Sequence, residues 1–171
     1  MSGTLNENNE VTKFTDSCYN LKIGKINNFI MIVNIEELNF GHSTSRADLM
    51  LLYRNDKNAL EIVLFELKNV NARLEGQKID DIKNRIFNKF NSTMSLFEEK
   101  NGRLNSNNKV TKLQGIFSDV VKGTKNKHKT FCLVIPAEFQ SQLVKIIFNI
   151  NEKNKKYFET KFLTEEQVFT H

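Results

Sequence analysis

The chain has 171 residues, of which 39% are hydrophobic, and carries a formal charge of +5. This length suits one domain with its own core, and the composition excludes an intrinsically disordered chain. The charge favours an anionic partner such as nucleic acid, although a soluble protein with a lysine-rich surface explains it equally well.

The first residues and the hydropathy pattern predict a cytoplasmic location with no membrane association. No apolar run approaches the roughly 18 residues of a membrane helix, and residues 1–10 are polar, unlike a secretory signal. The alternative to a cytoplasmic protein is a secreted effector that needs no cleavable signal. Cys18 and Cys132 are isolated in the sequence, so we expect free thiols instead of a zinc site or a disulfide framework.

We expect residues 1–9 to form a flexible arm and residues 10–171 to form one domain. Residues 10–20 show helical spacing of their apolar positions, which predicts a first helix; these positions are Val11, Phe14 and Cys18. A β-branched and apolar run then predicts a strand within residues 25–40, followed by a turn at "GHSTSR".

Two further strands are predicted at residues 48–54 and 60–68. The five residues between them, "NDKNA", suit a hairpin loop because Asn and Asp tolerate left-handed backbone conformations. Apolar residues then recur every three or four positions, which predicts a long amphipathic helix over residues 72–99.

The remaining elements alternate between helix and strand. We expect a short helix at residues 110–121, a buried strand at 130–136, a helix at 137–150 and an edge strand at 156–164. The predicted architecture is therefore α/β, with a mixed central sheet flanked by helices.

Charged residues interrupt the two strands of the predicted hairpin. Glu66 and Lys68 are two positions apart and so project from the same face of their strand. If the hairpin is symmetric about Lys57, Asp48 lies opposite Glu66, at the roughly 5 Å that separates cross-strand neighbours. A shift of one residue in the loop would send Asp48 to the other face.

A bound metal explains this arrangement, since two carboxylates held so close repel each other without a cation. The carboxylates of Asp48 and Glu66, together with the backbone carbonyl of Leu67, offer the oxygen ligands that suit Mg²⁺ or Mn²⁺. Such an ion would activate water for attack on a phosphate. Lys68 would position or deprotonate that water, or stabilise the developing charge.

Asp48 on one strand and Glu66-Leu67-Lys68 on the next resemble the D...ExK motif of the PD-(D/E)xK nuclease-like superfamily. The stretch "SRADLMLLYRNDKNALEIVLFELKN" is similar to the branch in which a "GRADL"-like strand precedes a "vlElK"-like one. The resemblance implies an αβββαβ restriction-endonuclease-like core and a magnesium-dependent nuclease acting on DNA, less often RNA. It also implies that Asp48 and Glu66 are metal ligands and that Lys68 is the catalytic lysine.

The sequence departs from this family in two places. Many relatives carry a Gln followed four residues later by Tyr on the helix after ExK, but here Gln77 is followed by Asp81. A Glu of the first helix often completes the metal site, and Glu10 is the candidate, although a charge in the first turn of a helix explains it equally well. Glu36 and Glu37 compete with Glu10 for that role, and exposure to solvent is the simpler explanation for both.

Basic residues supply the predicted contacts to nucleic acid. On the long helix these are Lys78, Lys83, Arg85 and Lys89, and the loop at residues 122–129 adds more cations. A solvated helix face accounts for the first four equally well. We therefore expect a nuclease, active as a monomer or as a homodimer; the alternative is a catalytically inactive module of the same fold that binds nucleic acid or a protein.

Overall fold

The computed structural model describes residues 12–16, 19–35, 38, 45–67, 79–98, 108–135, 159–164 and 167–170. The strands of its large sheet are β3 (Phe29–Asn34), β4 (Leu49–Arg54), β5 (Leu60–Leu67), β6 (Lys127–Ile135) and β7 (Glu159–Thr164). A small sheet contains β1 (Thr12–Asp16), β2 (Tyr19–Ile23) and β8 (Val168–Phe169). The helices are α1 (Ile79–Glu98) and α2 (Asn108–Lys122).

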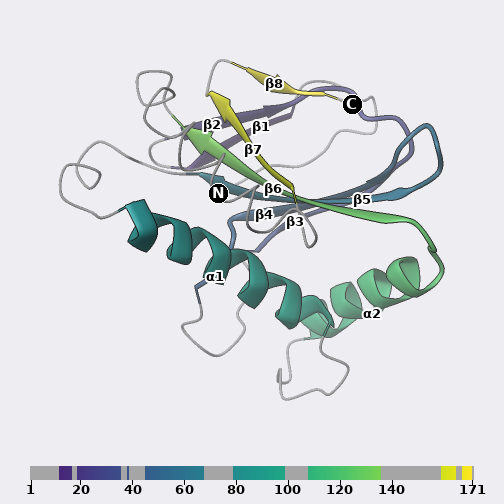
Figure 1. Cartoon of the computed structure of the whole chain (residues 1–171). Helices are drawn as coiled ribbons and strands as arrows, with labels where there is room; N and C mark the ends of the chain where they lie inside the picture. Colours follow the sequence, from purple (N-terminus) through teal and green to yellow (C-terminus); the bar gives the residue numbers. More distant parts are fainter. Residues whose placement is uncertain are drawn as a thin grey trace.

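The large sheet is mixed and has the strand order β3-β4-β5-β6-β7 (Figure 1). Its first three strands form an antiparallel meander, whereas β6 is parallel to both β5 and β7. Because a parallel neighbour requires a crossover, the chain leaves β5, passes through α1 and α2, and returns to β6. The predicted α/β class with a mixed central sheet is confirmed.

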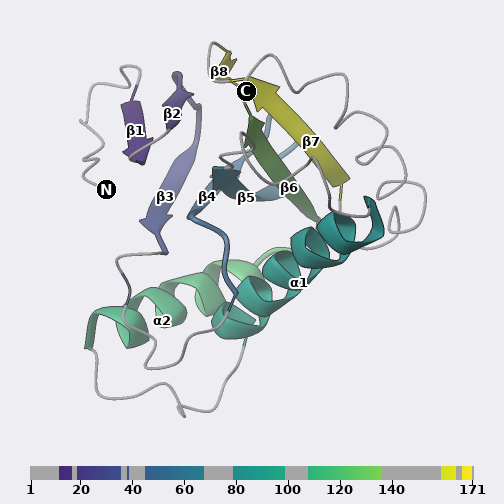
Figure 2. The ribbon, with the colours of Figure 1, turned by 90° about the vertical axis from the view of Figure 1, so that its left-hand side faces the viewer.

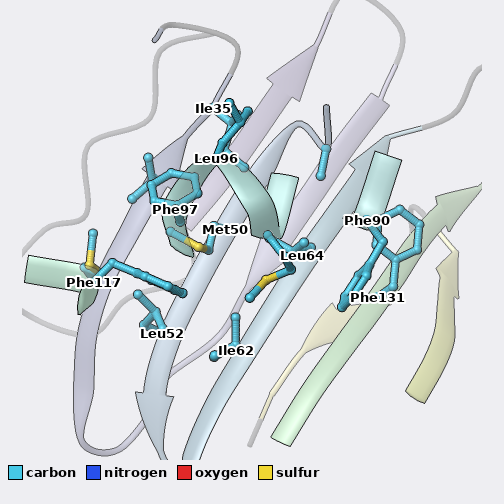
Figure 3. Close-up of a cluster of buried hydrophobic side chains, with 14 of the residues drawn as sticks. Ile35, Met50, Leu52, Ile62, Leu64, Phe90, Leu96, Phe97, Phe117 and Phe131 are labelled. Carbon is cyan, nitrogen blue, oxygen red and sulfur yellow. The ribbon is translucent and has the colours of Figure 1, made fainter. Parts of the chain in front are cut away.

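The described elements form three layers, with the large sheet between the two helices and the small sheet (Figures 1 and 2). Successive side chains of a strand point to opposite faces, so β5 contributes to two cores. Ile62 and Leu64 pack toward the helices, with Phe90 and Phe97 of α1 and Phe117 of α2 (Figure 3). The other face belongs to a second cluster under the small sheet, formed by Leu21, Ile23, Ile26, Leu49, Leu51, Tyr53, Val63, Phe65, Leu67, Cys132 and Val134.

The helix predicted over residues 10–20 is wrong, because this region contains a β-hairpin. Thr12 pairs with Ile23 and Asp16 pairs with Tyr19 in an antiparallel ladder. Three apolar residues at helical spacing give only a short amphipathic stripe, and an isolated helix of this length is marginally stable. Thr, Phe and Tyr favour strands, and the paired strand provides the hydrogen bonds that a short helix cannot keep.

The other predicted elements that lie within the described residues are confirmed with adjusted bounds. The first strand is β3, the hairpin strands are β4 and β5, and the long helix is α1, described from residue 79. The short helix is α2, the buried strand is β6, and β7 lies at the edge of the large sheet as predicted. The arm at residues 1–9 and the helix at 137–150 lie outside the described residues, and β8 was not predicted.

Neither of the two described helices combines the length and apolarity needed to cross a bilayer.

Candidate functional site

The two carboxylates of the motif lie at the same end of two central strands. The hairpin has the predicted symmetry about Lys57, with Arg54 paired to Leu60 and Leu49 paired to Phe65. One residue beyond that last pair, the backbone N–H of Asp48 donates to the carbonyl oxygen of Phe65 at 2.9 Å. The predicted register is therefore confirmed for the paired residues of β4 and β5. Asp48 itself precedes the ladder and bonds to Phe65, beside the end of β5 that carries Glu66, and the predicted direct pairing of Asp48 with Glu66 is not among the ladder pairs.

Asp48 is held by backbone groups of both neighbouring strands. Its carboxylate oxygen Oδ2 accepts the N–H of Leu67 at 2.5 Å, and its own carbonyl accepts the N–H of Ile35 at 2.9 Å. Only 5% of the residue is exposed. A hydrogen bond to a charged acceptor is stronger than a neutral one, so these contacts fix the orientation of the carboxylate at the point where the β4–β5 ladder ends.

Glu66 lies on the helix-facing side of β5, in the same row as Ile62 and Leu64, and is 1% exposed. Its Oε1 atom forms an ion pair with the ammonium group of Lys89 on α1. Burying a carboxylate is costly unless an opposite charge and hydrogen bonds compensate it, and Lys89 supplies both. Lys89 was predicted to contact nucleic acid, whereas the structure places it against the sheet with 22% of its side chain exposed.

The sequence contains a signal for the position of Lys89. Ile86, Phe90 and Met94 are buried on the inner side of α1. Lys89 follows Ile86 by three positions and precedes Thr93 by four, so it belongs to the same side of the helix. A lysine within an apolar stripe is therefore expected to meet a buried anion.

Thr93 fixes α1 against the start of β4. Its hydroxyl donates to the carbonyl of Lys89 at 2.8 Å and accepts the backbone N–H of Ala47 at 2.8 Å. Thr93 is fully buried, with 0% of its surface exposed. The residue before Asp48 is thus bound to the helix that carries Lys89, and the lysine and the two carboxylates are positioned by one connected set of contacts.

The chemistry of these donors fits a hard divalent cation. Mg²⁺ is bound in proteins through one or two carboxylates, with water and substrate phosphate completing its coordination. Asp48 and Glu66 supply two such carboxylates at adjacent strand ends. Within the part of the chain that the structure describes, no group of three or more His, Cys, Asp or Glu residues could hold a metal.

Several predicted site residues lie outside the part of the chain that the structure describes. These are Lys68, Glu10, Lys78 and Gln77, together with the side chains of Lys83 and Asp81. Arg85 is exposed on α1, as a nucleic-acid contact requires. The backbone carbonyl of Leu67 lies at the end of β5 beside Glu66, in a residue that pairs with Val134 of β6.

No match to this chain was found among protein-family models, curated proteins or solved structures.

A second polar cluster lies at the opposite end of β5 and was missed by the sequence analysis. Glu61 is 9% exposed, and its Oε1 accepts hydrogen bonds from Asn55 at 2.7 Å and contacts Nδ1 of His128 at 2.9 Å. Tyr53, Glu61 and His128 are paired across β4, β5 and β6. Burial, and secondarily the charge of Glu61, raise the pKa of the Tyr53 hydroxyl. The sequence signal for this cluster is the carboxylate of Glu61 within the apolar run "LEIVLFEL".

Exposed cations surround this second cluster. The hairpin loop and the segment between α2 and β6 are joined by hydrogen bonds from Arg54 to Thr124 at 3.0 Å and from the Leu60 N–H to the Asn126 carbonyl at 2.9 Å. We call the resulting surface the basic end; its exposed cationic residues are Lys57, Lys122, Lys125 and Lys127, beside His128. Asp56 and Asp119 are exposed nearby and offset part of this charge.

Proposed function

We propose that this protein is a metal-dependent nuclease of the PD-(D/E)xK type that hydrolyses phosphodiester bonds of DNA, or secondarily of RNA. The observation that carries the proposal is the pair of buried carboxylates, Asp48 and Glu66, at the same end of adjacent central strands. The order of the meander, the crossover and the parallel strand agrees with an αβββαβ core from its first strand onward. The hairpin β1–β2 stands where that core has its first helix.

Each of these residues would have a separate role in such a metal site. Asp48 and Glu66 would hold Mg²⁺ or Mn²⁺, with the Leu67 carbonyl as a third oxygen donor. When bound, the ion supplies Lewis-acid chemistry that activates water and offsets the negative charge of a phosphate. The Leu67 N–H keeps the Asp48 carboxylate oriented, and burial by the helix layer limits the solvent around Glu66.

The role of Lys68 follows from the resemblance alone. A lysine at this position would position the attacking water or stabilise the charge that develops on the phosphate. Lys89 brings an ammonium group to the Glu66 carboxylate from α1.

The test is cleavage of single-stranded, double-stranded and branched DNA and of RNA, each with Mg²⁺, Mn²⁺ or EDTA. Wild type should cut at least one substrate with metal and none with EDTA. Asp48→Asn, Glu66→Gln and Lys68→Ala should lose this activity, whereas Asp56→Asn and Glu98→Gln, which neutralise exposed carboxylates elsewhere, should keep it. Metal-dependent cutting that survives in Asp48→Asn and Glu66→Gln would refute the assignment of the site.

The basic end favours a second candidate function, which is binding of nucleic acid without cleavage. Its cations gather at the end of the sheet opposite Asp48 and Glu66, where they could contact a phosphate backbone independently of any metal. A double variant, Lys125→Gln with Lys127→Gln, should weaken binding of a labelled oligonucleotide in EDTA and reduce the salt dependence by about one ion per lost phosphate contact. The control is Lys112→Gln, which removes an exposed charge from α2.

A further inference from the structure

We propose that Lys89 is a resident cation of the Asp48–Glu66 site, which its ammonium group occupies until a divalent metal displaces it from Glu66. The inference rests on the proposed function, because it concerns the same metal site. It assigns Lys89 a role that differs from a nucleic-acid contact and from that of Lys68: the lysine sets how readily the site takes up its metal.

The need for a cation arises from the burial of Glu66. With 1% of its surface exposed, its carboxylate has almost no access to water that could solvate the charge. An ionised group in such a place requires a compensating positive charge. The Lys89 ammonium provides that charge in the structure, on the Oε1 atom of the carboxylate that would bind the metal.

The two partners differ in their freedom to leave. Glu66 belongs to a central strand with ladders on both sides, and only 2% of its side chain is exposed. Lys89 approaches from the helix layer, and 22% of its side chain is exposed. A flexible lysine at such a boundary can swing its ammonium group into water while its stem stays in place.

The exchange does not require movement of α1. Thr93 bonds both to the carbonyl of Lys89 and to the N–H of Ala47, so the backbone at Lys89 is fixed to the start of β4. Only the side chain of Lys89 has to change. The metal therefore enters a site whose strands and helix are already in position. Its entry requires that the ion pair between Lys89 and Glu66 separates.

Competition for one carboxylate has a direct consequence for affinity. A divalent ion must displace the ammonium group before it gains full contact with Glu66, so the ion pair lowers the apparent metal affinity. An ion pair that only stabilises the fold would not have this effect, because its removal would not make metal binding tighter. Metal affinity in a charge-removing variant therefore separates the two roles.

The first experiment measures Mn²⁺ binding to metal-free protein by isothermal titration calorimetry. Lys89→Met, which keeps the apolar stem, and Lys89→Gln, which also keeps a hydrogen-bond donor, should bind Mn²⁺ about tenfold more tightly than wild type, which corresponds to about 1.4 kcal/mol. Lys112→Met removes the same charge from an exposed position on α2 and should leave the affinity unchanged, because distant exposed charges are screened. Circular dichroism checks that each variant is folded.

A second experiment uses the wild-type chain and so does not depend on the folding of any variant. Acetylation of lysines with an N-hydroxysuccinimide ester, followed by peptide mass spectrometry, reports whether Lys89 is accessible. Saturating Mg²⁺ should raise the rate of Lys89 acetylation, since the displaced ammonium group reaches solvent. The rate at Lys112 should not change.

The outcomes separate the inference from the function on which it rests. Binding of Mn²⁺ by wild type with no gain in either Lys89 variant, or with no change in Lys89 acetylation, would overturn the inference and leave the metal site intact. Failure of wild type and of the folded Lys89 variants to bind Mn²⁺ would overturn both. Binding that occurs only in the Lys89 variants would overturn the displacement step, since the ammonium group would then exclude the metal from the wild-type site.

Discussion

The carboxylate of Asp48 accepts the backbone N–H of Leu67, the residue that follows Glu66 on the neighbouring strand. This bond takes the place of a ladder hydrogen bond beyond the last β4–β5 pair. Asp48 is therefore both a candidate metal ligand and a residue that closes the end of a central strand. Its two roles can be separated experimentally, because one requires a charge and the other requires only an acceptor.

Replacement of Asp48 should show this separation. Asp48→Ala leaves the buried Leu67 N–H without an acceptor and should lower the free energy of unfolding by about 1–3 kcal/mol. Asp48→Asn retains a carbonyl oxygen and should cost clearly less. Both variants should lose Mn²⁺ binding. Urea denaturation and calorimetry make the comparison, and equal destabilisation by the two substitutions would show that the charge, not the acceptor, holds the strand end.

The register of the hairpin was the part of the site that the sequence predicted best. Position pairs symmetric about Lys57 follow from the loop composition and from the alternation of the two strands, and the structure has these pairs. Local geometry was sufficient because all the information lies within about 20 residues of continuous chain, where turn chemistry fixes the pairing.

The contacts that complete the site could not be predicted in the same way. The ion pair of Lys89 with Glu66 and the hydroxyl bridge of Thr93 depend on how α1 packs across the sheet, which a helical period does not specify. The helical period of the apolar residues predicts which side of α1 is buried, but not which strand end α1 packs against. The hairpin β1–β2 was missed for a different reason: it is local, but the helical spacing of Val11, Phe14 and Cys18 competed with the strand preference of the Thr, Phe and Tyr residues in the same segment.

Thr93→Val should test the bridge between α1 and β4. Valine has nearly the same shape but no hydroxyl, so the buried N–H of Ala47 loses its acceptor, and the free energy of unfolding should fall by about 1–3 kcal/mol. Thr93→Ser keeps the hydroxyl and should lose only about 0.8 kcal/mol for one methyl group. Chemical denaturation of the three proteins gives the result; a valine variant as stable as wild type would mean that the bridge contributes nothing.

Two glycine substitutions should change stability in opposite directions. Gly115 is exposed in the middle of α2 with no atom within 4 Å of an added Cβ, so Gly115→Ala should stabilise the protein by about 0.5–1 kcal/mol.

A Cβ at Gly24 would lie 2.9 Å from Cγ2 of Thr170 and 3.2 Å from Cγ1 of Val168, so Gly24→Ala should lower the melting temperature by displacing β8. Thermal melts decide the sign of each change, and a rise for Gly24→Ala would contradict the close packing of β8.

The thiol of Cys132 should make the protein less stable in alkali. Burial, partly offset by Lys161, raises its pKa to about 12. An unfolded cysteine ionises near pH 8.5, so between about pH 8.5 and 12 only the unfolded state gains from deprotonation, and stability falls as pH rises. Under reducing conditions, wild type should lose more stability between pH 8 and 10 than Cys132→Ala does. An identical pH dependence in both proteins would exclude this contribution, and the comparison cancels that of Tyr53.

The pairing of β2 with β8 sets an order of events during synthesis. Lys22 pairs with Val168, and Phe169 stacks edge-on against Phe65 at a centroid distance of 5.1 Å. A ribosome makes β8 after every strand of the large sheet, so the cover over this face of β5 is completed only after residue 169 has emerged. Until then the nascent chain exposes Phe65 and its neighbours, and this face is where a chaperone would be expected to bind.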